Sequence, residues 1–488
     1  MVELRAVGVC AVLAALLLDD GGYVARSWGW SGAVAAAAAA LGIAWLRRVP
    51  RGRLELALVG GLAAFALWAL LSAWWSQSPP SSVAEAQRTV VPLAGALAAL
   101  VLFRRREAGA LAAAVLGAIT IVSLANLLHR GTTDDSGLSG AAARPIGYDN
   151  ALGLLAALGI LLALDAALRR GRWTVALATL PPNALVLVLA ASTGAYLALV
   201  AGLAFAAIAA GGRLRAAGLA ATVALVAVAA LAAGGHERER YWPVALDAAR
   251  DHPAVGAGAG TFWQLWLEER DVGLDARDAH GLYVETLGEL GVVGLALLLV
   301  ALAAPPVAAQ RGPRRPLLAG AYGAFLVHAG IDWDWELAGV AAVGVLTGCA
   351  LLLDARRDGE ERHVQPRLVA LWAAGAAVLI LAAALTFTGA TMLDRATAAE
   401  RDGRTVDALR SAERAASLQP WASEPWLVVA RTRRAAGGRG DPAAAAREGL
   451  ERDTHDWRLW LELAQSATGT ERERALERAR SLNPLGGF

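Results

Sequence analysis

The stretch DARDAHGLYVETLGELGVVGLALLLVAL (275–302) decides the fold of this chain. From Leu290 onward it is an apolar run without a charge, of the kind that crosses a bilayer as a helix. The part before Leu290 is more polar and carries His280, Glu285 and Glu289. The chain therefore places a histidine and two carboxylates where it enters the membrane, and ionisable groups at such positions indicate a candidate functional site.

The composition of the whole chain is typical of a membrane protein. Of its 488 residues, 57% are hydrophobic and only 18% are charged, whereas soluble domains have about 25% charged residues. The net charge of +2 gives no electrostatic support for a nucleic-acid partner. Cys10 and Cys349 both lie in apolar runs, which indicates neither a disulfide framework nor a metal site.

The apolar runs predict an all-α polytopic membrane domain over 1–393, with about 12 to 13 transmembrane helices of about 20 residues. Thirteen runs qualify: 5–19, 28–46, 54–75, 84–103, 108–128, 149–168, 173–190, 194–211, 216–234, 286–304, 317–333, 336–353 and 368–391. Arginines collect in alternate connections, which is typical of the cytoplasmic side. These connections are 47–53, 104–106, 169–172, 211–215, 310–315 and 354–367. An N-terminus inside the cell makes all of them cytoplasmic and places the large loop 235–285 outside.

The segment 394–488 has a different character, because it is rich in charge and in helix-forming residues. Trp426 and Trp460 are 34 positions apart, and Ala430 and Ala464 repeat this offset. The segment resembles a short array of tetratricopeptide repeats, whose period is about 34 residues. The odd number of spans places it outside the cytoplasm. Two interpretations stay open: a module that docks a partner or senses product length, and a helical cap that packs on the membrane domain.

Two of the outer connections are longer than a simple turn requires. The first ends in AAARPIGYDNALGLL, which puts Arg144 just before a span, although arginine is disfavoured on this side. The second, GHERERYWPVALDAARDHPAVGAGAGTFWQLW, predicts an amphipathic helix over roughly 237–250 that carries Arg238 and Arg240. Its GAGAG stretch follows no strand, so it does not indicate a dinucleotide-binding loop.

His280 lies on the outer face, near Tyr283 and Glu285. A lone histidine in a loop is most often a solvated polar residue, but imidazole is also the side chain best suited to take a proton near neutral pH. Arginines bind a diphosphate through paired hydrogen bonds. The other histidines form no HxxxH or HExxH pattern, so no metal is predicted. Displacement of a lipid diphosphate by a sugar hydroxyl is the chemistry that uses both groups without a metal.

Three segments carry a family resemblance: RPIGYDNALG (144–153), RERYWPVALDAARDHPAVGAGAGTF (238–262) and AHGLYVETLGELGVVGL (279–295). In order and spacing they resemble the superfamily of O-antigen ligases and O-antigen polymerases. The family's arginine four residues before a tryptophan corresponds to Arg238 and Trp242, although Arg240 is close enough to take its place.

Two positions depart from the family pattern. Gly281 follows the histidine, where the family commonly has asparagine, and Thr193 stands where the family usually has an arginine. The first departure affects how the histidine is oriented. The second implies a different donor head group or compensation by another arginine.

The resemblance implies inverting glycosyl transfer at the outer face of the cytoplasmic membrane, without a metal or cofactor. The donor would be a glycan on undecaprenyl diphosphate, and the acceptor a lipid, a glycan or a protein. His280 would deprotonate the acceptor hydroxyl, with Tyr283 and Glu285 in support. Arginines of the first two segments would bind the departing diphosphate, namely Arg144, Arg238 and Arg240.

Other functions stay open. A polymerase of lipid-linked repeat units has the same donor chemistry and a different acceptor. A transporter of polysaccharide or lipid is expected to place charges at the midplane of the membrane. The spans show few ionisable residues, with Asp165 near an inner end and Asp332 and Asp334 near an outer one. A non-catalytic envelope scaffold would tolerate replacement of His280 and Arg144.

Overall fold

A computed structural model describes residues 1–132, 144–170, 173–212, 214–218, 238–311, 315–356, 365–437 and 440–488. The regular secondary structure of this part of the chain is all helical, and it contains no strand. Its helices are α1 (Val2–Leu18), η1 (Asp20–Gly22), α2 (Ala25–Leu46), α3 (Arg53–Ser72), α4 (Pro79–Leu102), η2 (Arg105–Glu107), α5 (Ala108–Thr132), α6 (Asp149–Arg170), α7 (Trp173–Ala190), α8 (Thr193–Ala210), α10 (Arg238–Asp251), α11 (Phe262–Glu269), α12 (Leu282–Arg311), α13 (Pro316–Ala329), η3 (Asp334–Glu336), α14 (Ala338–Ala355), α15 (Pro366–Arg401), α16 (Thr405–Leu418), α17 (Glu424–Ala435), α18 (Pro442–Leu450), α19 (Trp457–Ser466) and α20 (Gly469–Leu482).

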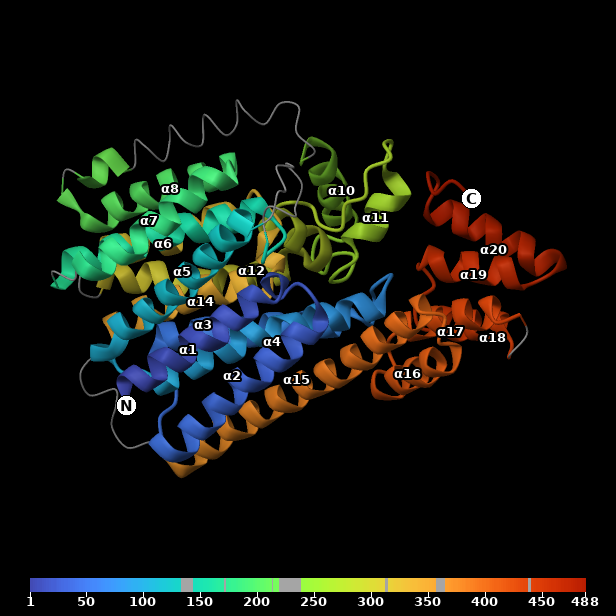
Figure 1. Cartoon of the computed structure of the whole chain (residues 1–488), viewed down its shortest axis with the longest axis horizontal. Helices are drawn as coiled ribbons and strands as arrows, with labels where there is room; N and C mark the ends of the chain where they lie inside the picture. The colour runs from blue at the N-terminus through green and yellow to red at the C-terminus, as the bar shows by residue number, and fades with distance from the viewer. Residues whose placement is uncertain are drawn as a thin grey trace.

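Ten helices in the described ranges are long and apolar enough to cross a membrane: α2 to α8, α12, α14 and α15. They run side by side along the long axis of the molecule (Figure 1). Two further predicted spans correspond to shorter helices, α1 with 17 residues and α13 with 14. The predicted run 216–234 lies almost entirely outside the described residues. The prediction of an all-α, multi-pass membrane protein is confirmed, with ten spanning candidates where the sequence indicated 12 to 13.

The bundle has an inner layer and an outer layer. Helices α4, α6 and α14 are the most buried of the spanning candidates, whereas α15 is the least buried and packs mainly against α2. Helices α8 and α13 approach closely through Gly202 and Gly320, because a Cβ on either glycine would lie 2.9 or 2.4 Å from the carbonyl oxygen of the other. Small residues permit such contacts between membrane helices, where packing rather than the hydrophobic effect drives association.

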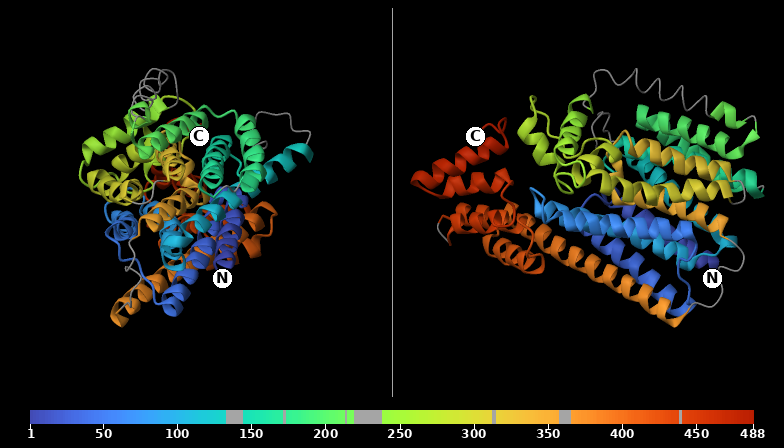
Figure 2. Two further views of the ribbon diagram at one scale, coloured as in Figure 1. Left: turned by 90° about the vertical axis from the view of Figure 1, so that its left-hand side faces the viewer. Right: turned by 180° about the vertical axis from the view of Figure 1, so that it is seen from behind.

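The arginine-bearing ends of the spans meet at one end of the bundle. Arg356, after α14, donates to Glu55 of α3 at 2.6 Å, and Arg315, before α13, pairs with Asp165 of α6. The tail and helices α10 and α11 lie at the opposite end (Figure 1; Figure 2). The structure thus separates the arginine-rich connections from the large loop, as the alternation in the sequence predicts.

The predicted boundary between the membrane domain and the tail falls within a helix, because α15 has 36 residues and continues past 394 to Arg401. The chain first turns at Gly403, whose φ is 71°. Helices α16 to α20 then pack, each on the next, around a core to which Ala396 of α15 also contributes. Successive packed helices are typical of helical repeats, and the tetratricopeptide character of this segment stays a prediction.

The tail also packs on the large loop and on the start of α4. Ser78, before α4, donates to Asp453 of the tail at 2.5 Å. Arg270, after α11, donates to Asn483 Oδ1 at 2.9 Å. These four side chains are buried or nearly so, so the tail makes the contacts expected of a cap on the membrane domain.

Candidate functional site

His280 lies at the entrance to α12, in the left-handed backbone conformation with φ 56°. Such a conformation is uncommon for a residue with a side chain and is often found at functional sites. Its Nδ1 lies 3.0 Å from the carbonyl oxygen of Asp278. Because a carbonyl only accepts, the neutral imidazole carries its proton on Nδ1 and presents Nε2 as the proton acceptor. The half-buried ring lies 5.1 Å from Tyr241 and 6.5 Å from Trp333 between centroids.

The two buried glutamates of α12 hold the loops around this histidine. Glu285 accepts a hydrogen bond of 2.6 Å from the N–H of Ala279, the residue before the histidine. Glu289, one turn further on, accepts from the N–H groups of Gly260 at 2.8 Å and Phe262 at 2.9 Å. The second contact is at the N-terminus of α11, where the helix dipole favours a carboxylate. Both glutamates therefore position the backbone of the site.

The GAGAG stretch (256–260) packs against a break in α12. Gly291 breaks the helix with φ 65°, and a Cβ there would lie 2.3 Å from the carbonyl carbon of Ala254. Gly256 has φ 69°, and a Cβ there would lie 2.2 Å from the carbonyl carbon of Glu289. Only glycine fits both the left-handed conformation and this close approach. Close packing of backbone on backbone therefore explains why glycine stands at these positions, without a dinucleotide-binding role.

Arg238 reaches from α10 to the connection between α13 and α14. Its guanidinium lies 3.8 Å from Oδ2 of Asp332, which is buried. Asp332 also accepts hydrogen bonds of 2.8 Å from the hydroxyl of Tyr148 and of 2.8 Å from the amide of Asn150. Burial, reinforced by the charge of Asp332, raises the pKa of the Tyr148 phenol, so this hydroxyl keeps its proton and donates it.

Trp333 lies between the His280 loop and the Tyr148–Asp332 pair. Its ring centroid lies 4.6 Å from that of Tyr148 and 6.5 Å from that of His280. The three segments singled out in the sequence therefore meet at one end of the bundle, together with a fourth. Sequence analysis placed Asp332 and Asp334 only at the outer end of a span. The signal that would have found this segment is its composition, DWDWE, between two apolar runs.

The other predicted site residues lie in different surroundings. Arg240 donates to Asp271 at 2.6 Å, and both side chains are largely exposed. Arg144 is exposed on the turn before α6. Tyr283 donates to the carbonyl oxygen of Leu326 at 2.9 Å and so links α12 to α13. Of the two arginines left open by the sequence, only Arg238 approaches the segments that surround the histidine.

A cluster of carboxylates beside the His280 loop was not predicted. Side-chain oxygens of Asp278, Glu285 and Glu336 lie within 4.8 Å of one another. Arg88 of α4 pairs with Glu336 and with Glu85. Burial raises the pKa of Asp278 to about 7, although Arg88 acts in the opposite direction. Three carboxylates at this spacing could hold a divalent cation, so metal dependence has to be measured.

The membrane domain also holds more charge than the sequence analysis recognised. A cavity of about 90 Å³ is bounded by Glu85, Arg88 and Glu289 on its polar side and by apolar side chains elsewhere. All three residues lie on helices that qualify as membrane spans. The expectation of few ionisable residues inside the spans is therefore corrected: Glu85 and Arg88 lie in the polar first turns of α4, next to Ser82 and Gln87, and were not counted among the charges of the spans.

No family model matches this chain, and curated protein sequences give no match. The site combines an imidazole with an available acceptor nitrogen, an arginine and a buried carboxylate. Such groups can take a proton from a hydroxyl and bind an anionic leaving group.

Proposed function

We propose that this protein is a membrane glycosyltransferase, which moves a glycan from an undecaprenyl diphosphate carrier to an acceptor hydroxyl. The observation that carries the proposal is the convergence of His280, Arg238 and Asp332, from three separate segments, at one end of a helical membrane bundle. The resemblance to O-antigen ligases and polymerases supplies the classes of donor and acceptor.

In the proposed reaction, Nε2 of His280 takes the proton of the acceptor hydroxyl as its oxygen attacks the anomeric carbon. The bond from the anomeric carbon to the diphosphate oxygen breaks, and the diphosphate leaves with the electron pair, which inverts the configuration. Arg238 stabilises the negative charge of the leaving group, and Asp332 positions Arg238. Arg144, on the turn before α6, is the proposed second cation.

The test is glycan transfer by purified protein in detergent with EDTA and a lipid-diphosphate oligosaccharide. We expect His280→Ala and Arg238→Ala to reduce the rate by at least about 100-fold. Arg240→Ala is the matched control and is expected to retain activity, because Arg240 pairs with exposed Asp271. Full activity of His280→Ala would refute the catalytic assignment. The size of the product separates single transfer by a ligase from repeated transfer by a polymerase.

We also propose that the membrane is the cytoplasmic membrane and that the tail is an extracytoplasmic, tetratricopeptide-like module that binds a protein partner. Support comes from the arginine-bearing ends of the spans, which lie opposite the tail, because arginine is enriched on the cytoplasmic side. Single cysteines in place of exposed Arg104 and Arg410, labelled in intact cells with an impermeant maleimide, test this topology. Labelling at 104 but not at 410 would reverse it.

Transport of a polysaccharide or lipid is a second candidate, favoured by the charges around the small cavity in the membrane domain. Buried ionisable groups on spanning helices are typical of transport pathways. This function predicts that Arg88→Gln abolishes flipping of a fluorescent lipid-linked glycan in proteoliposomes, whereas His280→Ala leaves it unchanged. Loss of glycosyl transfer in the His280 variant would argue against it.

A further inference from the structure

A large cavity lies at the arginine-rich end of the bundle, opposite His280. Its volume is about 910 Å³, within the range of about 300–1,000 Å³ that is usual for small-ligand sites. It lies between α1, η2, α5, α6 and α7, with the end of α14 on its rim. Helix α6 connects the two regions, because Asn150 at its start binds Asp332, whereas Asp165 near its end lines the cavity.

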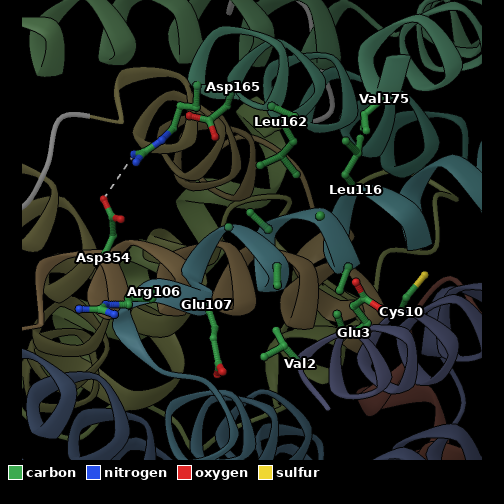
Figure 3. A pocket seen from close by; sticks show the side chains of 18 of the residues that line it. Val2, Glu3, Cys10, Arg106, Glu107, Leu116, Leu162, Asp165, Val175 and Asp354 are labelled. Carbon is green, nitrogen blue, oxygen red and sulfur yellow. Dashed lines mark ion pairs between the residues drawn. The ribbon is translucent and has the colours of Figure 1, made fainter. Parts of the chain in front are cut away.

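The cavity has a charged side and an apolar side. Asp165, Asp354 and Arg106 lie on one side, whereas Leu116 and Val175 lie on the other (Figure 3). This division resembles the division within a membrane lipid, which has a charged headgroup and apolar chains. A soluble metabolite without an apolar part would leave the second wall without a partner.

Arginines gather on the charged side. Three of the four acids that line the cavity are paired with arginines: Glu107 with Arg5 at 3.3 Å, Asp165 with Arg315, and Asp354 with Arg169 at 3.8 Å. Arg105 and Arg106 line the same cavity from η2, and Glu3 is the only other acid in its lining as described. The described lining carries four arginines and four acids, and Arg5, which pairs with Glu107, lies outside it. Glu3 lies beside Cys10, away from Arg106 (Figure 3), so the adjacent guanidinium groups of Arg105 and Arg106 on η2 are the feature of the charged side that favours an anion.

We propose that this cavity binds an anionic phospholipid. The phosphate would lie at Arg105 and Arg106, and an acyl chain would begin along Leu116, Leu162 and Val175. Basic pockets between transmembrane helices on the cytoplasmic side bind anionic lipid headgroups in this way. The site is distinct from the His280 site and does not depend on the reaction proposed for it.

The test is native mass spectrometry of delipidated protein titrated with phosphatidylglycerol, with phosphatidylcholine or with sodium phosphate. We expect phosphatidylglycerol to bind at least about fivefold more tightly than phosphatidylcholine, and sodium phosphate not to compete at equal concentration. Arg105→Gln and Arg106→Gln should each weaken phosphatidylglycerol about fivefold. Arg53→Gln is the matched control, because Arg53 is an exposed arginine at the start of α3 and lies outside the cavity lining.

A second variant tests the apolar wall without altering charge. Ala113 lines the cavity and is exposed there, so Ala113→Trp should fill part of it and reduce phosphatidylglycerol binding while the protein stays folded. Equal binding of the two lipids by wild-type protein would overturn the proposal. Competition by sodium phosphate would assign the cavity to a free anion instead, which also overturns it.

Discussion

Two arginines of α10 offer a matched experiment, because each pairs with an acid in different surroundings. Arg238 pairs with Asp332, and Arg240 pairs with Asp271. The side chain of Asp332 is 1% exposed and that of Arg238 is 33% exposed, whereas Asp271 is 75% and Arg240 is 47% exposed. At the 3.8 Å between Arg238 and Asp332, an effective dielectric constant of about 20 gives an attraction of about 4 kcal/mol. Screening at partly exposed Arg238 lowers the expected coupling to about 1–2 kcal/mol. The exposed pair is expected to contribute between about 0 and 1 kcal/mol.

Asp332→Asn is the informative change. It keeps one oxygen to accept from Tyr148, but places an amide N–H₂ where an oxygen now faces the amide of Asn150. Loss of that acceptor should lower the free energy of unfolding by about 1–3 kcal/mol. Arg238 also loses its counter-charge, and a displacement of about 1 Å at a reacting group reduces a rate by up to about 100-fold. Asp271→Asn should change stability by less than about 0.5 kcal/mol and leave the rate unchanged.

The assay combines thermal unfolding in detergent with the rate of glycan transfer, for each single variant and for the corresponding double variants. The double-mutant cycle isolates the coupling between arginine and acid from the cost of each substitution. The reasoning fails if Asp332→Asn and Asp271→Asn have the same effects on stability and rate. If Asp332→Asn lowers stability without lowering the rate, the hydrogen-bond network of Asp332 stabilises the fold. In that case Asp332 does not position Arg238 for the reaction.

Three further predictions concern the tail, the glycine loop and metal. Burial raises the pKa of Asp453 from 3.8 to about 6, so its stabilising contribution is present below pH 3.8 and is lost as the pH rises through 6. Amide hydrogen exchange near Ser78, corrected for intrinsic rates, should therefore be slower at pH 5 than at pH 7. Asp453→Asn should remove this difference. Gly256→Ala should lower the free energy of unfolding by at least about 2 kcal/mol more than Gly403→Ala, because both glycines have positive φ but only Gly256 would bring a Cβ against backbone. EDTA should leave glycan transfer unchanged, whereas loss of activity that Mg²⁺ restores would assign a catalytic metal to the carboxylates around Asp278.

The elements that sequence analysis predicted well are those defined by neighbouring residues. Helix α10 was predicted over roughly 237–250 and extends from Arg238 to Asp251. The predicted start of the tail falls within α15 because charged residues appear before this helix ends. A helix can leave the membrane without ending, so a change in composition does not locate the end of the helix.

By itself, the sequence determined that this is a helical multi-pass membrane protein and that His280 precedes a span, because hydropathy and charge are local properties of a segment. Only the tertiary structure decided that Arg238 faces Asp332 while Arg240 faces solvent. Residues two positions apart on a helix point in nearly opposite directions, and which side is buried depends on what packs there. Likewise, Tyr148 and Asp332 are 184 positions apart, and only the packing of helices brings them within 2.8 Å.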